Sequence, residues 1–331
     1  MISVKHLSKY YGEHLAVEDM SLEIEQGHVY GFLGPNGAGK STTMNIIAGC
    51  LSASSGTVLV DGYDIFEEPD EAKRCIGYLP EHPPLYLNES VSDYLKFVGE
   101  AKGLRGKELD WQIRKAMERT GIEAVAKRRI GQLSKGYRQR VGIAQALLGN
   151  PKVMILDEPT VGLDPIQILE IRDLIRELGK THTVIFSSHI LSEVQTICDR
   201  ILMIAHGRVV ACGTPEELRS QLASAGELQV LTDAGDDQIR TCLAGLTLTE
   251  EPAIQPEGDL HAVHIPVSGD TRELAGRIFH AFAAHGFTIY ELSRKQSSLE
   301  EVFLELSGEG ETPRESGMDS GENRTAEEEP A

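Results

Sequence analysis

A nine-residue glycine-rich segment, GPNGAGKST, constrains the fold more than any other feature of the sequence. It fits the pattern G-x-x-x-x-G-K-[ST], follows a strand-like segment (HVYGFL) and precedes a helix-like one (TTMNIIAG). Glycines let consecutive backbone N–H groups surround phosphate oxygens, and the helix N-terminus adds a partial positive charge there. Lys40 supplies a full charge and Ser41 can bind Mg²⁺. The predicted nucleotide-binding residues are Gly34, Pro35, Asn36, Gly37, Ala38, Gly39, Lys40, Ser41 and Thr42.

Apolar and polar residues recur along the chain with two different periods. The first 30 residues alternate as short strands, with turn signals at Gly12 and Gly27. A helical period runs from about Pro83 to Asn150, and strands then return as VMILD, TVIFSS and RILMIAHGRVV around the helical stretch IQILEIRDLIRELGK. Strands that alternate with helices predict an α/β fold with a parallel sheet covered on both faces. The segment GTPEELRSQL is expected to be a helix with Thr214 as its N-cap.

The pattern of strands and helices begins again after residue 222. Segment 223–307 is expected to be a small C-terminal α/β domain, regulatory or dimer-supporting, because it carries no catalytic cluster. Segment 308–331 has eight acidic residues and almost no large apolar side chains, so it is predicted to be a disordered acidic tail. A nucleotide-binding domain is therefore expected at 1–222, with a helical subdomain at about 83–150.

Charge and cysteine content exclude several classes of protein. The net charge of −19 argues against nucleic acid as a partner, because phosphate backbones attract basic surfaces. The five cysteines form no C-x-x-C pair, which suits a reducing cytosol and offers no zinc site or disulfide framework. The longest aliphatic runs are strand-sized and far shorter than a membrane span. We therefore expect a soluble chain, or one attached to a membrane only through another chain.

Two adjacent carboxylates follow the predicted strand KVMIL. Asp157 can complete the coordination shell of Mg²⁺, and Glu158 can act as a general base on water. The pair alone would be a weak signal, since Asp-Glu after a strand often begins a loop. Together with the upstream phosphate loop they predict a site that hydrolyses a nucleoside triphosphate rather than transferring its phosphate to a substrate hydroxyl.

The segment QLSKGYRQR is typical of the start of a helix, with Ser134 as N-cap and Gly136 allowing close backbone approach. In its place along the chain it resembles LSGGQ, the signature of the ABC ATPase family. Lys135 stands where the family has its first glycine, and Tyr137 where it has glutamine. The resemblance covers about the first 220 residues, with the motifs in the family's order. It implies an α/β fold: a P-loop ABC ATPase core with a mixed sheet, a helical subdomain and the small C-terminal α/β domain.

The resemblance assigns roles to four more residues. Tyr11 matches the aromatic residue that stacks on adenine, with Tyr10 as the alternative, and Val17 is expected in the same nucleotide site. Asp164 in GLDP falls on the family's D-loop. His189 in FSSH matches the switch histidine that contacts the γ-phosphate and is counted among the catalytic residues with Glu158 and Lys40.

The segments GYLPEHPPLY and SSLEEVFLELSGE resemble those of bacterial export subunits of the gliding-motility and multidrug types. Such subunits work with separate membrane permeases. The resemblance implies a homodimer that encloses two ATP molecules with Mg²⁺, in which Ser134, Lys135 and Gly136 act across the interface. It also implies a peripheral position at the cytoplasmic face of the cell membrane, held there by the permease. The cargo cannot be inferred from these residues.

Other P-loop proteins are the alternatives to a transporter subunit. A soluble ABC ATPase acting on a macromolecular complex usually has two cassettes, whereas this chain has one. A DNA-repair relative would carry long coiled-coil insertions. A P-loop kinase or motor would lack the LSKG, GLDP and FSSH series.

Glu81 stands where the family has glutamine, on a loop that senses the γ-phosphate and Mg²⁺ and also touches the permease. An ionised glutamate accepts hydrogen bonds but cannot donate one to water. Two roles remain open: Mg²⁺ ligation, which we favour, and a salt bridge to a basic segment of the permease. A third carboxylate near Asp157 and Glu158 is also expected to raise the proton affinity of the cluster.

Overall fold

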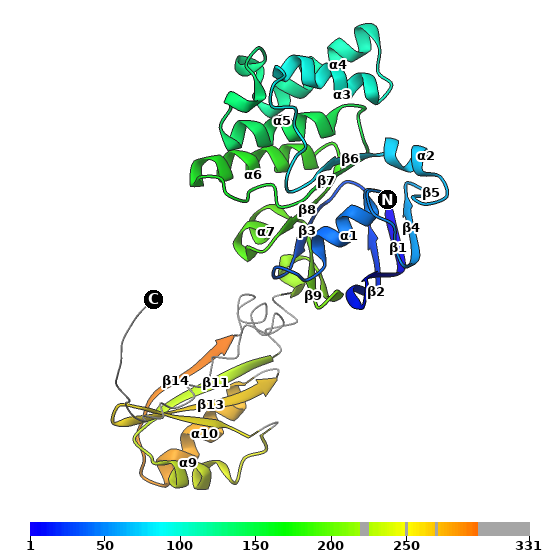
Figure 1. The fold of residues 1–331 in the computed structure, drawn as a ribbon. Helices are drawn as coiled ribbons and strands as arrows, with labels where there is room; N and C mark the ends of the chain where they lie inside the picture. The colour runs from blue at the N-terminus through cyan, green and yellow to red at the C-terminus, as the bar shows by residue number, and fades with distance from the viewer. Residues whose placement is uncertain (219–224, 249–250, 269–270, 297–331) are drawn as a thin grey trace, which may run out of the picture.

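The computed structural model describes residues 1–218, 225–248, 251–268 and 271–296 (Figure 1). The centre of the first 218 residues is a six-stranded sheet in the order β10-β9-β3-β8-β7-β6. Five strands are parallel, and β10 pairs antiparallel with β9 at the edge, so the predicted mixed sheet is confirmed. The strands are β3 (Val29–Leu33), β6 (Ile76–Leu79), β7 (Val153–Leu156), β8 (Thr183–Ser188), β9 (Arg200–Ala205) and β10 (Arg208–Gly213).

A second, antiparallel sheet has the order β2-β1-β4-β5. Its strands are β1 (Ile2–Tyr11), β2 (His14–Ile24), β4 (Ser55–Val60) and β5 (Tyr63–Asp64). The expectation of short strands here was wrong, because β1 and β2 have 10 and 11 residues. Their pairing continues through register shifts between Val4 and Tyr10. These shifts interrupt the alternation of apolar and polar residues from which strand length is predicted. The predicted turn at Gly12 has a φ of 59° and joins the two strands.

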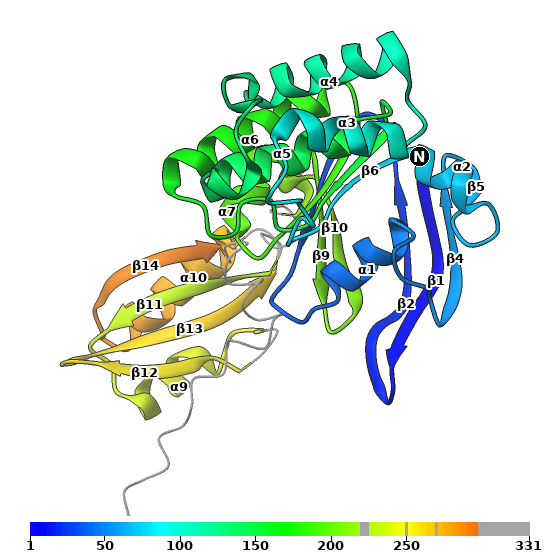
Figure 2. The ribbon, with the colours of Figure 1, turned by 45° about the horizontal axis from the view of Figure 1, so that its top comes forward.

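Seven helices, α1 to α7, surround the two sheets between residues 40 and 197. They are α1 (Lys40–Ile47), α2 (Pro69–Arg74), α3 (Val91–Ala101), α4 (Gly106–Thr120), α5 (Lys135–Leu147), α6 (Pro165–Gly179) and α7 (Leu191–Ile197). The short 3-10 helices η1 (Glu123–Val125) and η2 (Ile130–Gln132) lie between α4 and α5. Figure 2 shows α3, α4 and α5 grouped together, which agrees with the helical pattern predicted for about 83–150.

The central sheet lies between two hydrophobic clusters. Successive residues of β7 belong to them alternately: Met154 and Leu156 to the cluster that includes α3, α4 and α5, and Val153 and Ile155 to the cluster that includes α1. This follows from the two-residue period of a strand, whose side chains point to opposite faces. Both faces of β7 are buried, so the end of the strand is held rigidly where the predicted carboxylates begin.

Helix α7 packs very closely on β3. A Cβ added at Gly31 of β3 would overlap Val194 and Cys198, which lie on α7 and at its C-terminal end. Only a residue without a side chain fits between the strand and the helix. This fixes α7 directly beneath the strand that leads into the glycine-rich loop.

Thr214 caps the residues that follow β10, as predicted. Its hydroxyl accepts a hydrogen bond from the Glu217 N–H (3.1 Å), and the Glu217 carboxylate accepts one from the Thr214 N–H (2.8 Å). Residues 215–218 are helical, and the rest of the predicted helix lies outside the described residues.

The C-terminal unit is a four-stranded antiparallel sheet in the order β12-β13-β11-β14. Its elements alternate as strand, helix, strand, strand, helix, strand: β11 (Ala225–Thr232), α9 (Asp236–Leu243), β12 (Ala253–Glu257), β13 (Leu260–Ser268), α10 (Arg272–Ala284) and β14 (Ile289–Gln296). A third hydrophobic cluster is built only from residues between 228 and 292. The predicted helix SLEEVFLELS and the predicted acidic tail lie outside the described residues.

Candidate active site

The glycine-rich loop connects the end of β3 with the start of α1. Gly37 and Gly39 have φ values of 81° and 99°, which side-chain-bearing residues rarely adopt. A Cβ on Gly39 would lie 2.6 Å from the Ala16 carbonyl oxygen, so this position excludes larger residues in space as well as in conformation. The loop therefore curls closely ahead of the N-terminus of α1, the arrangement that binds phosphate.

Lys40 is the first residue of α1 and points back into the loop. It is only 6% exposed, and its Nζ donates to the carbonyl oxygens of Gly34 (2.7 Å) and Pro35 (3.1 Å). The Nζ also lies 3.6 Å from Oε1 of Glu158. Burial lowers the pKa of the Lys40 ammonium group, and the charge of Glu158 opposes that effect. A cation is thus held on the concave side of the loop.

Ser41 and Asp157, two of the three predicted Mg²⁺ ligands, are brought together although they are 116 residues apart. The Ser41 hydroxyl donates to Oδ1 of Asp157 (3.0 Å), and so does the Ser187 hydroxyl (2.7 Å). Burial raises the pKa of the Asp157 carboxyl, and the charge of Glu81 acts in the same direction, while both hydrogen bonds and Lys40 oppose it. The expected influence of Glu81 on the cluster therefore exists, but burial is the larger cause.

These donors fit a magnesium ion. A hydroxyl and a carboxylate supply hard oxygen ligands, and Mg²⁺ in nucleotide sites usually adds waters and substrate phosphates to one or two such groups. Over the described residues, no three His, Cys, Asp or Glu side chains converge as a metal site. The residues present therefore suit an ion that arrives with a nucleotide rather than one held by the protein alone.

Glu158 occupies the centre of the site. It is buried, its Oε1 faces Lys40 and its Oε2 lies 3.1 Å from Nδ1 of His189. Its backbone φ is 46°, an uncommon conformation for a residue with a side chain, and its N–H donates to the Ser187 hydroxyl (2.7 Å). The strained backbone directs the carboxylate into the cavity instead of along the strand.

A cavity of about 510 Å³ unites these groups. It is lined by Tyr11, His14, Ala16, Asn36, Gly37, Gly39, Lys40, Ser41, Thr42, Glu81, Glu158, Val161 and His189. Of the two tyrosines considered for base stacking, Tyr11 lines the cavity and Tyr10 does not. Val17 is fully buried; its Cγ2 lies 3.6 Å from where a Gly39 Cβ would be, so it supports the loop from behind.

Sequence analysis missed His14, Ala16 and Val161 as lining residues. The first two reach the cavity because the β1–β2 hairpin returns the chain past Tyr11, and no motif marks their positions. Val161 lies three residues after Glu158 and shares its loop, a proximity that could have suggested it.

The signature and D-loop residues lie elsewhere. Ser134 is the N-cap of α5 and accepts a hydrogen bond from the Tyr137 N–H (3.3 Å), as predicted. Asp164 caps α6 in the same way through the Gln167 N–H (2.9 Å). Neither residue, nor Lys135 or Gly136, lines the cavity of its own chain. A Cβ on Gly136 would lie 2.6 Å from Oε1 of Gln167 on α6, so a larger residue here would require that flexible side chain to move.

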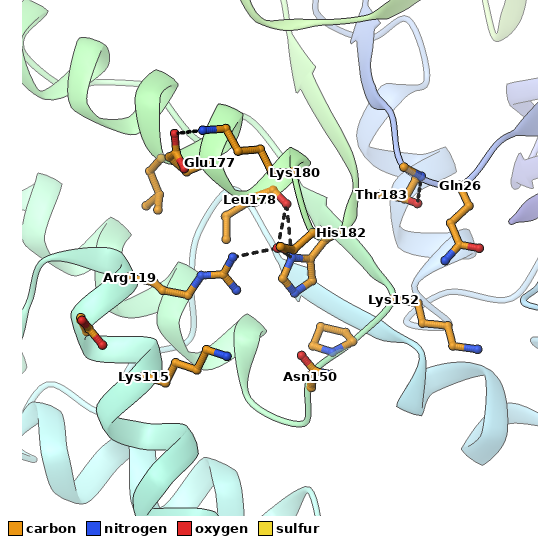
Figure 3. A pocket seen from close by; sticks show the side chains of 15 residues that line it. Gln26, Lys115, Arg119, Asn150, Lys152, Glu177, Leu178, Lys180, His182 and Thr183 are labelled. Carbon is orange, nitrogen blue, oxygen red and sulfur yellow. Dashed lines mark hydrogen bonds and ion pairs between the residues drawn. The ribbon is translucent and has the colours of Figure 1, made fainter.

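A larger cavity, of about 750 Å³, lies at the opposite ends of the parallel strands, where Lys152 precedes β7 and His182 precedes β8 (Figure 3). Lys115 and Arg119 of α4 extend into it, and Arg119 donates to the Thr181 hydroxyl (2.7 Å). It has neither the glycine-rich loop nor the carboxylates that follow β7. Size alone would point to this cavity, but the chemistry points to the smaller one.

His182 in this second cavity makes stability depend on pH. The side chain is buried, and burial lowers its pKa, with the charges of Arg119 and Lys115 acting in the same direction. The unfolded chain therefore binds more protons than the folded chain below a pH of about 6.5, so the stabilisation is present above that pH and is lost as pH falls. We expect the unfolding free energy of the wild type to fall more steeply from about pH 7 to about pH 5 than that of His182→Gln. Urea titrations at several pH values would measure this free energy. An equal dependence on pH in the two proteins would contradict the prediction.

Fold and site together define a P-loop ATPase. Comparison with known proteins narrows the class: the family described as ABC transporter matches residues 17–161. YxlF of Bacillus subtilis, an uncharacterized ABC transporter ATP-binding protein, is 33% identical over 313 residues, covering 92% of this chain and 99% of YxlF. The bacitracin transport ATP-binding protein BcrA of Bacillus licheniformis is 32% identical over 317 residues, covering 94% and 98%. The chain therefore belongs to the ABC transporter ATP-binding protein family and is an ABC ATPase.

A solved structure of a family member supports the same assignment. The dimeric post-hydrolysis state of the ATP-binding cassette MJ0796, bound to ADP and Pi, has a TM-score of 0.59 and 27% identity, covering 65% of this chain and 98% of that one.

No helix among the described residues is long and apolar enough to cross a membrane.

Proposed function

We propose that this chain is the ATP-hydrolysing subunit of an exporter, driving a separate membrane permease through ATP-dependent closure of two copies. The observation that carries the proposal is the convergence of Lys40, Ser41 and the Glu158–His189 pair on one cavity next to the glycine-rich loop, with Asp157 hydrogen-bonded to Ser41. The similarity to BcrA, a bacitracin transport ATP-binding protein, supports export. The alternative is a soluble ABC ATPase that acts on a macromolecular complex.

Each of these residues has a role in the proposal. Loop N–H groups and Lys40 would bind the phosphates, and Ser41 and Asp157 would hold Mg²⁺, which would supply positive charge beside them. The Glu158 carboxylate would accept a proton from water while the water oxygen bonds to the γ-phosphorus and the bond from that phosphorus to the ADP oxygen breaks. His189, whose Nδ1 lies 3.1 Å from Oε2 of Glu158, would contact the γ-phosphate. The products are ADP and inorganic phosphate.

Two copies of the chain complete each site in this proposal. Ser134 and Lys135 are exposed at the N-terminus of α5, which offers unpaired N–H donors, but they lie outside the cavity of their own chain. A second copy would place them, with Gly136, on the γ-phosphate, and would bring Asp164 to the interface. ATP would then be part of the contact, and hydrolysis would remove the group that both copies bind.

The permease is proposed to dock beside the loop of Glu81. Tyr86, Leu87 and Phe97 are each about half exposed, and the Tyr86 ring lies 5.3 Å from that of Phe97. Such an exposed apolar cluster suits a partner surface. This contact would keep the chain at the cytoplasmic face of the membrane.

Co-purification tests the partner. Mild-detergent capture of the full chain from its native membrane is expected to recover a polytopic membrane protein, and a variant with Tyr86→Ser and Phe97→Ser is expected to lose it. Tyr290→Ser changes an equally exposed tyrosine of the C-terminal unit and is the matched control. Recovery of ribosomes in place of a membrane protein would favour the soluble alternative.

Glu81→Gln tests the role of the unusual carboxylate. Glu81 lines the cavity and its charge reaches Asp157, so we propose that it ligates Mg²⁺. The amide is a weaker ligand, and we expect the Mg²⁺ concentration for half-maximal ATP hydrolysis by the assembled complex to rise by about 3- to 10-fold. Unchanged Mg²⁺ dependence together with weaker permease capture would support the salt bridge instead.

A further inference from the structure

Glu193 is a buried carboxylate that the proposed reaction does not use. It lies in the first turn of α7, four residues after His189, and is only 1% exposed. A carboxylate in such surroundings is costly unless other groups bind it. Its partners therefore indicate what it does.

One oxygen of Glu193 joins the two segments that carry the central residues of the site. Oε2 accepts a hydrogen bond from the Thr160 hydroxyl (2.9 Å) and another from the Ser188 hydroxyl (2.9 Å). Thr160 lies two residues after Glu158, and Ser188 directly precedes His189. The Ser188 hydroxyl also accepts from the N–H of Ile190 (3.0 Å), so it fixes the backbone on both sides of His189.

The other oxygen of Glu193 faces Arg172 of α6. Arg172 Nη2 lies 3.2 Å from Oε1, yet the two are not aligned as a hydrogen bond: among the described residues, neither Oε1 nor Arg172 Nε has a hydrogen-bond partner. When atoms of a buried ion pair lack hydrogen bonds, the attraction between the charges compensates poorly for the free energy of removing them from water. Stabilisation of the fold is thus a weak reason for the carboxylate. The hydrogen bonds of Oε2 give a better one.

We propose that Glu193 is a positioning residue for ATP hydrolysis, fixing the segment of Glu158 relative to the segment of His189. The inference rests on the proposed function, in which these two residues act on water and the γ-phosphate. Their direct contact, 3.1 Å between Glu158 Oε2 and His189 Nδ1, joins two different strand ends. The Ser187 hydroxyl, which bonds the Asp157 carboxylate and the Glu158 N–H, is another link between those ends. Glu193 adds a further one through Thr160 and Ser188, outside the lining of the cavity.

The backbone of Glu158 explains why a further link is needed. Its φ of 46° persists only when surrounding contacts enforce it. The Ser187 hydroxyl holds the N–H of Glu158, and the Glu193–Thr160 bond holds the chain two residues later. Displacement of a reacting group by about 1 Å can reduce a rate by roughly 100-fold.

Kinetics of four variants test the inference. Glu193→Gln keeps the shape but carries no charge; Thr160→Val and Ser188→Ala each remove one hydroxyl with little change in volume; Glu177→Gln is the same exchange at an exposed site on α6. We expect kcat to fall by about 10- to 100-fold in Glu193→Gln and by smaller factors in the two hydroxyl variants, with KM for ATP within about twofold. Glu177→Gln is expected to match the wild type. Unchanged kcat in the first three variants, or a change confined to KM, would overturn the inference.

Hydrogen exchange followed by mass spectrometry separates this inference from the proposed function. Peptides covering 157–164 and 187–193 are expected to exchange faster in Glu193→Gln than in the wild type, in both segments, with ATP affinity unchanged. This readout does not require hydrolysis. A wild-type chain that hydrolyses no ATP would refute the proposed function, whereas unchanged exchange in both segments would refute the positioning role.

Discussion

Replacing Glu158 with glutamine is expected to lower kcat for ATP hydrolysis by about 100- to 10,000-fold, the range over which a general base contributes. Glutamine has nearly the same size, and its one amide oxygen can face Lys40 while its NH2 group donates to Nδ1 of His189, at positions where the Glu158 contacts span 3.6 and 3.1 Å. It cannot take a proton from water. The steady-state rate of ATP hydrolysis should therefore fall, while the equilibrium affinity for ATP stays within about threefold of the wild type.

Glu158→Gln also tests the mechanism in which two copies close on ATP. When hydrolysis is blocked, ATP should hold two copies of Glu158→Gln together, and size-exclusion chromatography with light scattering would show an ATP-dependent dimer. The exposed Glu177→Gln serves as control and should keep both wild-type activity and the wild-type mass distribution. A Glu158→Gln chain that stays monomeric at saturating ATP would contradict closure on nucleotide, even if its hydrolysis were lost.

Lys40→Met is expected to weaken ATP binding by roughly 100-fold, since a charged hydrogen bond to phosphate contributes about 3 kcal/mol at most. Methionine fills the same buried space beside the Gly34 and Pro35 carbonyls but has no donor and no charge. Titration with a fluorescent ATP analogue would measure the loss.

Lys180→Met provides the matched control for Lys40→Met, because Lys180 is exposed at the C-terminal end of α6 and, among the described residues, pairs with Glu177 of that helix at 2.5 Å. Its ATP affinity should equal that of the wild type. Undiminished affinity in Lys40→Met would show that the backbone N–H groups of the loop bind the phosphates without help from the lysine.

The sequence predicted those parts of the site that a contiguous motif determines. Local residue order determines the loop from Gly34, the position of Asp157 directly after β7 and the N-cap at Ser134, and each is where it was expected. The roles given to these residues remain predictions. His14 was not foreseen, because its place depends on a hairpin whose register shifts disrupt the alternation of its side chains.

The buried orientation of Glu193 also could not be predicted from the sequence. A single glutamate in a short segment between two predicted strands usually indicates a solvent-exposed charge. Only the close packing of α7 on β3, which Gly31 permits, turns it inward toward Thr160 and Ser188. Such contacts between distant segments leave no periodic signal in the sequence.

The separate hydrophobic cluster of the C-terminal unit has a consequence for every stability measurement made on this chain. Its residues, between 228 and 292, are shared with neither cluster of the first 218 residues, so we expect heating to produce two melting transitions rather than one. Trp111, the chain's one tryptophan, lies on α4, and its fluorescence should follow only the transition of the first unit. Calorimetry would record both, and comparing the two signals would show which transition a given substitution moves.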